Sequence, residues 1–174
     1  MRQKRIRLAA GVAVVAIASV VATTALAGDG GNAKAKLSGF EEVPAISTAG
    51  SGEFKAKIRS QRIDYTLSYR DLEGGTVSAA HIHLGQRSVN GGVSAFLCGG
   101  GDKPPCPPSG TVEGTIDPTD VIGPANQGIA PGEFDELVRA IRAGVTYANV
   151  HTTPTYPGGE IRGQIDGGRG DDDD

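Results

Sequence analysis

The sequence is poor in several residue types, and each shortage limits what the protein can do. Only 5% of its residues are aromatic, and its 27 glycines follow no triplet period, which excludes a collagen-like fibre. Histidine occurs three times and cysteine twice, so any site made of these residues uses most of them. No nucleophile has a base and an acid at a spacing typical of a hydrolase, so the sequence gives no support for hydrolase chemistry.

The first 27 residues have the parts of a secretory signal peptide. A basic start precedes an uncharged, mostly apolar run over residues 8–26, which ends in the small-x-small signal Ala25-Leu26-Ala27. Cleavage there would leave a polar spacer at 28–32 and a protein that is secreted or lies in the cell envelope, without a membrane span. The alternative is an uncleaved anchor, because the run approaches the length of a transmembrane helix.

A surplus of basic residues is also absent. Without residues 1–27 the chain has 13 Lys and Arg against 20 Asp and Glu, a formal charge of −7. Asp171 to Asp174 supply four of the negative charges, in an acidic tail at 167–174 that we expect to be disordered. A surface this acidic argues against nucleic acid as a partner, because such binding depends on Lys and Arg at phosphates.

Short runs of alternating residues between glycines predict an all-β fold, an antiparallel Greek-key sandwich or barrel of about 7–9 strands. The clearest run has Ile63, Tyr65, Leu67 and Tyr69 on one face, and a two-residue hairpin joins it to the run before it. The expected strands lie at 34–40, 52–59, 62–72, 76–84, 93–97, 110–116, 145–151 and 160–165. Together they predict one domain over 33–166.

One short helix interrupts the strands. Residues 131–142 have apolar side chains at helical spacing, with acidic residues in the first turn and Arg139 and Arg142 in the last. Gly144 follows as a stop signal. We therefore expect an amphipathic helix inserted into the β-domain.

The histidines lie in two of the predicted strands. Because side chains alternate along a strand, His81 and His83 share one face and Ile82 points to the other. The same alternation places His151 on one face of a later strand with Tyr147. If the small apolar residues face the core, all three histidines lie on outer faces. They then form either a copper or zinc site with an open position, or a set of imidazoles that bind only by hydrogen bonds.

The two cysteines, Cys98 and Cys106, enclose a loop rich in glycine and proline. A disulfide between them would fix this loop in an oxidising compartment. The alternative, a metal site with two thiolates, is expected to have a shorter spacing or nearby histidines.

Several motifs, in order, resemble those of the CHRD domain, a module named after the secreted protein chordin. The motifs are Ala80 to Gly85, Gly114 to Ile116, Gly128-Ile129, Tyr147 to Thr152 and Pro157 to Gln164. The resemblance spans residues 33–166. It implies a secreted β-sandwich module, and an unidentified protein or surface partner as its ligand.

A second, weaker resemblance is to copper/zinc superoxide dismutase. In that family a paired and a later histidine bind copper and an arginine guides the anion, which implies those roles for His81, His83, His151 and Arg162. With three histidines in total, this chain cannot build the complete two-metal site of that family. We therefore expect a binding module rather than an enzyme, with a superoxide dismutase-like copper enzyme as the alternative.

Two further side chains near the histidines have expected partners. Glu160 and Arg162 lie on one strand face, where an ion pair between them or across strands is the default. Glu160 or Asn149 is also expected to orient the imidazole rings of a metal site.

Overall fold

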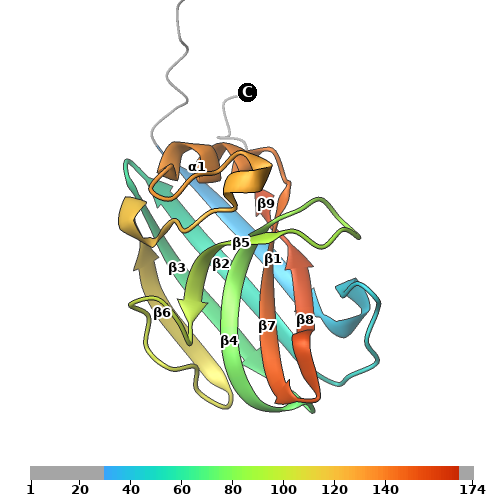
Figure 1. Ribbon diagram of the computed structural model, residues 1–174. Coiled ribbons are helices and arrows are strands. Elements are labelled where there is room, and N and C mark those ends of the chain that lie inside the picture. Colours follow the sequence, from blue (N-terminus) through green and yellow to red (C-terminus); the bar gives the residue numbers. More distant parts are fainter. Residues whose placement is uncertain (1–29, 169–174) are drawn as a thin grey trace, which may run out of the picture.

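The computed structural model describes residues 30–168, which form nine β-strands and one α-helix (Figure 1). The predicted signal peptide, 1–27, and the acidic run Asp171–Asp174 lie outside these residues. The strands are β1 (Gly31–Ser38), β2 (Ser51–Arg59), β3 (Arg62–Arg70), β4 (Gly75–Leu84), β5 (Gly92–Cys98), β6 (Gly110–Ile116), β7 (Thr146–Pro154), β8 (Tyr156–Gln164) and β9 (Asp166–Gly167). The predicted domain limits, 33 and 166, stay a prediction.

All strands belong to one antiparallel sheet in the order β5-β4-β7-β8-β1-β2-β3-β6, with the short β9 beside β1. The sheet curls so that β4 and β7 face β2 and β3 across the core (Figure 1). This confirms the predicted all-β sandwich or barrel with one helix. It also brings β4 and β7, which are far apart in the chain, together as hydrogen-bonded neighbours.

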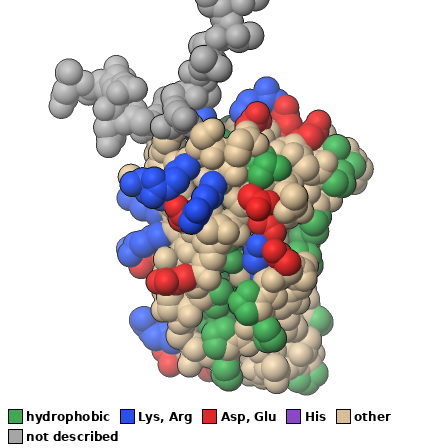
Figure 2. All heavy atoms as spheres, turned by 90° about the vertical axis from the view of Figure 1, so that its left-hand side faces the viewer, with side chains coloured by type: hydrophobic (Ala, Val, Ile, Leu, Met, Phe, Trp, Pro, Cys, Tyr) green, Lys and Arg blue, Asp and Glu red, His purple; other side chains and the backbone are tan. Residues whose placement is uncertain are grey.

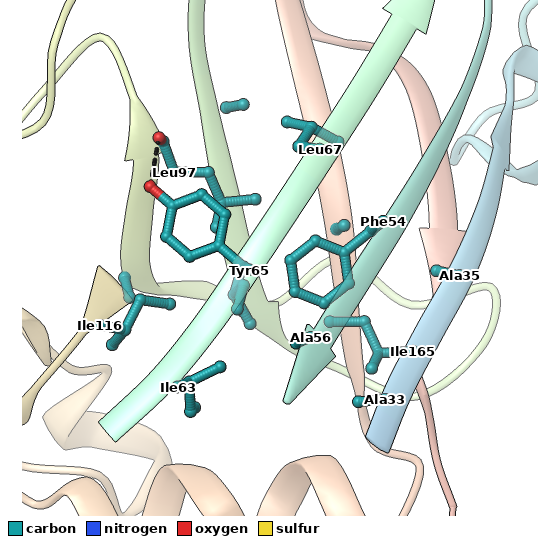
Figure 3. Packing of buried hydrophobic residues seen from close by; sticks show 14 of the residues in the cluster. Ala33, Ala35, Phe54, Ala56, Ile63, Tyr65, Leu67, Leu97, Ile116 and Ile165 are labelled. Atoms are coloured by element: carbon teal, nitrogen blue, oxygen red, sulfur yellow. Dashed lines mark hydrogen bonds between the residues drawn. The ribbon is translucent and has the colours of Figure 1, made fainter. Parts of the chain in front are cut away.

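Alternation along the strands forms the core. Ile63, Tyr65, Leu67 and Tyr69 of β3 are all buried, as their spacing predicts. The ring of Tyr65 stacks beside that of Phe54 of β2, with centroids 6.4 Å apart (Figure 3). Hydrophobic burial of such a set is the main stabilising contribution to the fold. The predicted two-residue turn joins β2 to β3, and Gln61 in it has a left-handed φ of 53°.

The helix α1 (Phe134–Arg142) begins three residues later than predicted. Pro131 to Glu133 form a turn instead, in which Gly132 has a φ of 88° and donates its N–H to Val121 O at 2.8 Å. A left-handed residue ends helical geometry, so the helix begins only after it. The apolar face of α1 is buried and covers one end of the barrel (Figure 1), and the chain turns away at Gly144, as predicted.

The two outermost strands of the sheet, β5 and β6, meet at a seam. Tyr65 Oη donates to Leu97 O at 2.7 Å across it (Figure 3). Cys98, at the end of β5, forms a disulfide with Cys106 in the loop that leads to β6. This confirms the predicted disulfide and excludes the alternative of a two-thiolate metal site.

The outer surface of β2 and β3 is charged. Basic and acidic side chains are intermixed on the face of the molecule in Figure 2. On these strands Lys55 pairs with Glu53, and Arg59 and Arg62 both pair with Asp64. These ion pairs are exposed and contribute little to stability.

Candidate functional site

The structure brings the three histidines together on the outer face of β4 and β7. Antiparallel pairing sets Ala79 opposite His151 and His81 opposite Asn149, so the imidazoles of the two strands become neighbours. His81 Nδ1 lies 3.0 Å from His151 Nε2, and one ring nitrogen from each of the three residues lies within 4.8 Å of the others. The intervening residues, such as Ile82, are in the core, which confirms the predicted alternation.

Two of the rings are oriented by backbone carbonyls. His83 Nδ1 donates to Gly91 O at 3.0 Å, and His151 Nδ1 donates to Pro157 O at 3.1 Å. A carbonyl oxygen only accepts, so each of these Nδ1 atoms carries the proton and each Nε2 has a lone pair. The Nε2 of His151 uses that lone pair to accept from His81 Nδ1, 3.0 Å away. The Nε2 of His83 is buried and has no hydrogen-bond partner among the described residues.

The surroundings keep the imidazoles neutral at pH 7. Burial, together with the neighbouring His151 and His83, lowers the pKa of His81 to about 3. Burial lowers the pKa of His83 to about 4, although the Gly91 carbonyl acts in the opposite direction, and burial also lowers the pKa of His151. Neutral imidazole is the form that binds metals, so the rings need not lose a proton first.

Aromatic rings pack around the histidines. His83 stacks on Tyr147 with ring centroids 4.7 Å apart, and Phe96 meets His81 edge-on at 4.6 Å. The guanidinium of Arg162 lies 3.4 Å from the centre of the Tyr147 ring, as a cation–π contact. These contacts restrict the positions that the rings can adopt.

Arg162 is buried and holds the loop between β4 and β5 in place. Its guanidinium donates to Gln86 O at 3.1 Å and Val89 O at 2.9 Å, and to Asn90 Oδ1 at 3.3 Å. Tyr147 Oη accepts from the N–H of Gly91 at 3.1 Å in the same loop. The loop therefore covers the face on which His83 lies.

The predicted ion pair between Glu160 and Arg162 is wrong, whereas a cross-strand partner of Glu160, Thr152 of β7, is present. Its buried carboxylate accepts four hydrogen bonds, from Thr48 Oγ1 (2.7 Å), Glu73 N (2.6 Å), Gly74 N (3.0 Å) and Thr152 Oγ1 (2.7 Å). It neither pairs with Arg162 nor orients an imidazole ring. Three of the donors belong to loops that strand alternation does not describe, and the fourth, Thr152, belongs to β7; together they satisfy this carboxylate completely.

Two residues of the site were not predicted as such: Glu42, and Tyr147, which was expected only to share a strand face with His151. Glu42 follows a short 3₁₀ turn at Gly39–Glu41 and is buried near Arg162. Burial raises its pKa to about 7, although Arg162 acts in the opposite direction. Tyr147 and His151 are four residues apart in one strand, a spacing that places both side chains on the same face and could have identified Tyr147 as part of the site. No such periodicity identifies Glu42.

Among residues 30–168, no helix is long and apolar enough to cross a bilayer. No curated protein matches the chain, and no comparison supports the resemblance to superoxide dismutase. The profile of the CHRD domain matches residues 33–165, about three quarters of the sequence. This match covers every strand that carries a histidine, and the chain belongs to the CHRD domain family.

Proposed function

We propose that this protein is an extracytoplasmic CHRD binding module with a copper or zinc site at His81, His83 and His151. The observation that carries the proposal is the buried Nε2 of His83, which has no partner and lies beside two further imidazole nitrogens. A buried polar atom without a partner is costly, and a bound cation would remove that cost.

The donor set fits these two metals. Imidazole suits copper and zinc. Once the proton of His81 moves from Nδ1 to Nε2, Nδ1 of His81 and Nε2 of the other two rings present three nitrogens to one ion. Metal–nitrogen bonds of about 2 Å place two nitrogens at most about 4 Å apart. A pair that starts 4.8 Å apart must therefore close by at least about 0.8 Å on binding. Three ligands leave a fourth position open.

The location and the binding role rest on other observations. The Cys98–Cys106 disulfide is typical of oxidising compartments, and CHRD membership agrees with the signal peptide expected at 1–27. In this proposal the mature protein has one domain, at 33–166, which binds an unidentified protein or surface partner. It includes no catalysis, because nothing in the site supports the superoxide dismutase alternative.

Calorimetric titration with Cu(II) and Zn(II) tests the site. We expect one ion per chain in the natural protein and loss of this binding in His83→Ala. A matched control replaces Asp171 to Asp174 with asparagine, which removes the acidic run and leaves the histidines intact. Undiminished binding in His83→Ala, or loss of binding in the tail variant, would overturn the proposal.

A further inference from the structure

Two more buried polar atoms without a partner lie near the histidines. Among the described residues, Oε1 of Glu42 and Oδ1 of Asn149 are buried and have no hydrogen bond. Glu42 is 7% exposed and Asn149 is 3% exposed, so solvent does not replace the missing partners. Native structures seldom leave buried polar atoms without partners, and two of them together indicate a bound group.

The two oxygens converge on one point. Gly159 has a φ of 127°, and a Cβ at this position would lie 2.4 Å from Asn149 Oδ1 and 2.5 Å from Glu42 Oε1. Both oxygens therefore lie against the backbone of the same glycine. Any residue with a side chain would fill the space that they share.

This point is on the histidine face. Asn149 is paired with His81 across β4 and β7, and with Arg162 across β7 and β8, so its side chain lies between theirs on the sheet. The start of β8, which contains Gly159, also contains Pro157, whose carbonyl accepts from His151. The two oxygens and the three imidazoles thus share one covered surface.

The chemistry of the unpaired atoms defines what they bind. The amide oxygen of Asn149 only accepts hydrogen bonds. Because burial raises the pKa of Glu42 to about 7, its carboxyl is an acceptor only where it is ionised, above that pH. Arg162 brings a positive charge close to Glu42 and disfavours a second metal ion there. A neutral group with N–H or O–H donors satisfies both oxygens without adding charge.

We propose that Glu42 and Asn149 form a hydrogen-bond-accepting subsite beside the histidines, which selects a neutral protic ligand, in the simplest case water, for the open position of the ion. This inference rests on the proposed metal site. It assigns the two residues a selective role: ligands with N–H or O–H donors are favoured over anions without a proton.

The test uses Cu(II)-loaded full-length protein and azide, an anion that binds open copper positions and donates no hydrogen bond. Charge-transfer absorption during an azide titration gives its dissociation constant. In Glu42→Gln one acceptor oxygen and the negative charge are lost, so azide should bind at least tenfold more tightly than to the natural protein. The near-isosteric Asn149→Leu, which removes the other acceptor, should shift the affinity in the same direction.

The matched control is Glu41→Gln. Glu41 precedes Glu42 but pairs with Arg87 at the surface, so its replacement should leave azide affinity unchanged. Equal azide affinity in Glu42→Gln, Asn149→Leu and the natural protein would overturn the subsite and show that the two side chains pair with each other. Failure of the natural protein to bind either copper or zinc would instead overturn the proposed function, so the two failures are distinguishable.

Discussion

Replacement of Glu160 by glutamine tests the central polar contact of the fold. The carboxylate of Glu160 is fully buried, and each of its oxygens accepts one hydrogen bond from a backbone N–H and one from a threonine hydroxyl. The donors belong to the loop before β2, the connection between β3 and β4, and β7. One side chain therefore connects three segments that are distant in the sequence.

The expected loss follows from the donors. In Glu160→Gln one oxygen keeps its two hydrogen bonds, and the amide NH₂ takes the place of the other. The threonine hydroxyl on that side can turn and accept, but the backbone N–H of Glu73 or Gly74 cannot, so two donors face each other. An unsatisfied buried donor and the loss of a charged acceptor together lower the free energy of unfolding by about 2–4 kcal/mol.

The pH dependence separates this effect from a general packing defect. Burial alone would raise the pKa of Glu160, but the four hydrogen bonds together hold it below its usual value. The stabilisation is therefore complete above the ordinary glutamate pKa and is lost as the pH falls through the lowered value. A protonated carboxyl also has a donor on one oxygen, as the glutamine amide does on its nitrogen. The difference in free energy of unfolding between the natural protein and Glu160→Gln should therefore shrink in acid.

Urea denaturation followed by circular dichroism measures this difference between pH 3 and pH 7. Thr152→Val removes one donor at nearly constant shape and should cost about 1.5 kcal/mol. Glu41→Gln, a surface replacement, should stay within about 0.5 kcal/mol. A loss below 0.5 kcal/mol for Glu160→Gln at pH 7, or a difference that grows in acid, would refute the reasoning.

Two further predictions concern stability. In the metal-free protein the pKa values of His81 and His83 are lowered to about 3 and about 4, so below the ordinary histidine pKa of about 6.5 the unfolded chain binds more protons than the folded chain. The free energy of unfolding should therefore decrease as the pH is lowered from about 6.5 to 3. A stability that does not change over this pH range would contradict the burial of neutral rings. The disulfide between Cys98 and Cys106 closes a loop with a sequence separation of 8, so replacing both residues with serine should lower the free energy of unfolding by about 2.5 kcal/mol in denaturation experiments. A reductant should lower the free energy of unfolding of the natural protein by the same amount and leave that of the variant unchanged.

Strand alternation predicted the histidine face because it is a local property. Ile63 to Tyr69 and residues 81–83 have the burial that their spacing predicts, since each strand has one face in the core. The position of His151 beside the other two needed β7 to pair with β4 in a particular register, which short motifs do not determine. It was expected only from chain order and from the small residues next to each histidine.

The polar contacts of the site could not be predicted, because loops supply them. Glu42 comes from a loop without periodicity, and its burial depends on where Gly159 and Arg162 lie in the folded sheet. An ion pair between Glu160 and Arg162 was predicted because the two share a strand face, yet the carboxylate of Glu160 instead accepts hydrogen bonds from residues 48 and 73–74 in loops. The late start of α1 has a similar cause, a contact between Gly132 and the distant Val121.

The disulfide at the seam between β5 and β6 affects how the reduced chain would behave. Where the disulfide cannot form, a covalent tie between β5 and the segment before β6 is missing, and two strands with unpaired backbone groups lie at the margins of the sheet. Such margins recruit strands from other molecules. Formation of the disulfide would thus protect the chain from self-association as well as stabilise it.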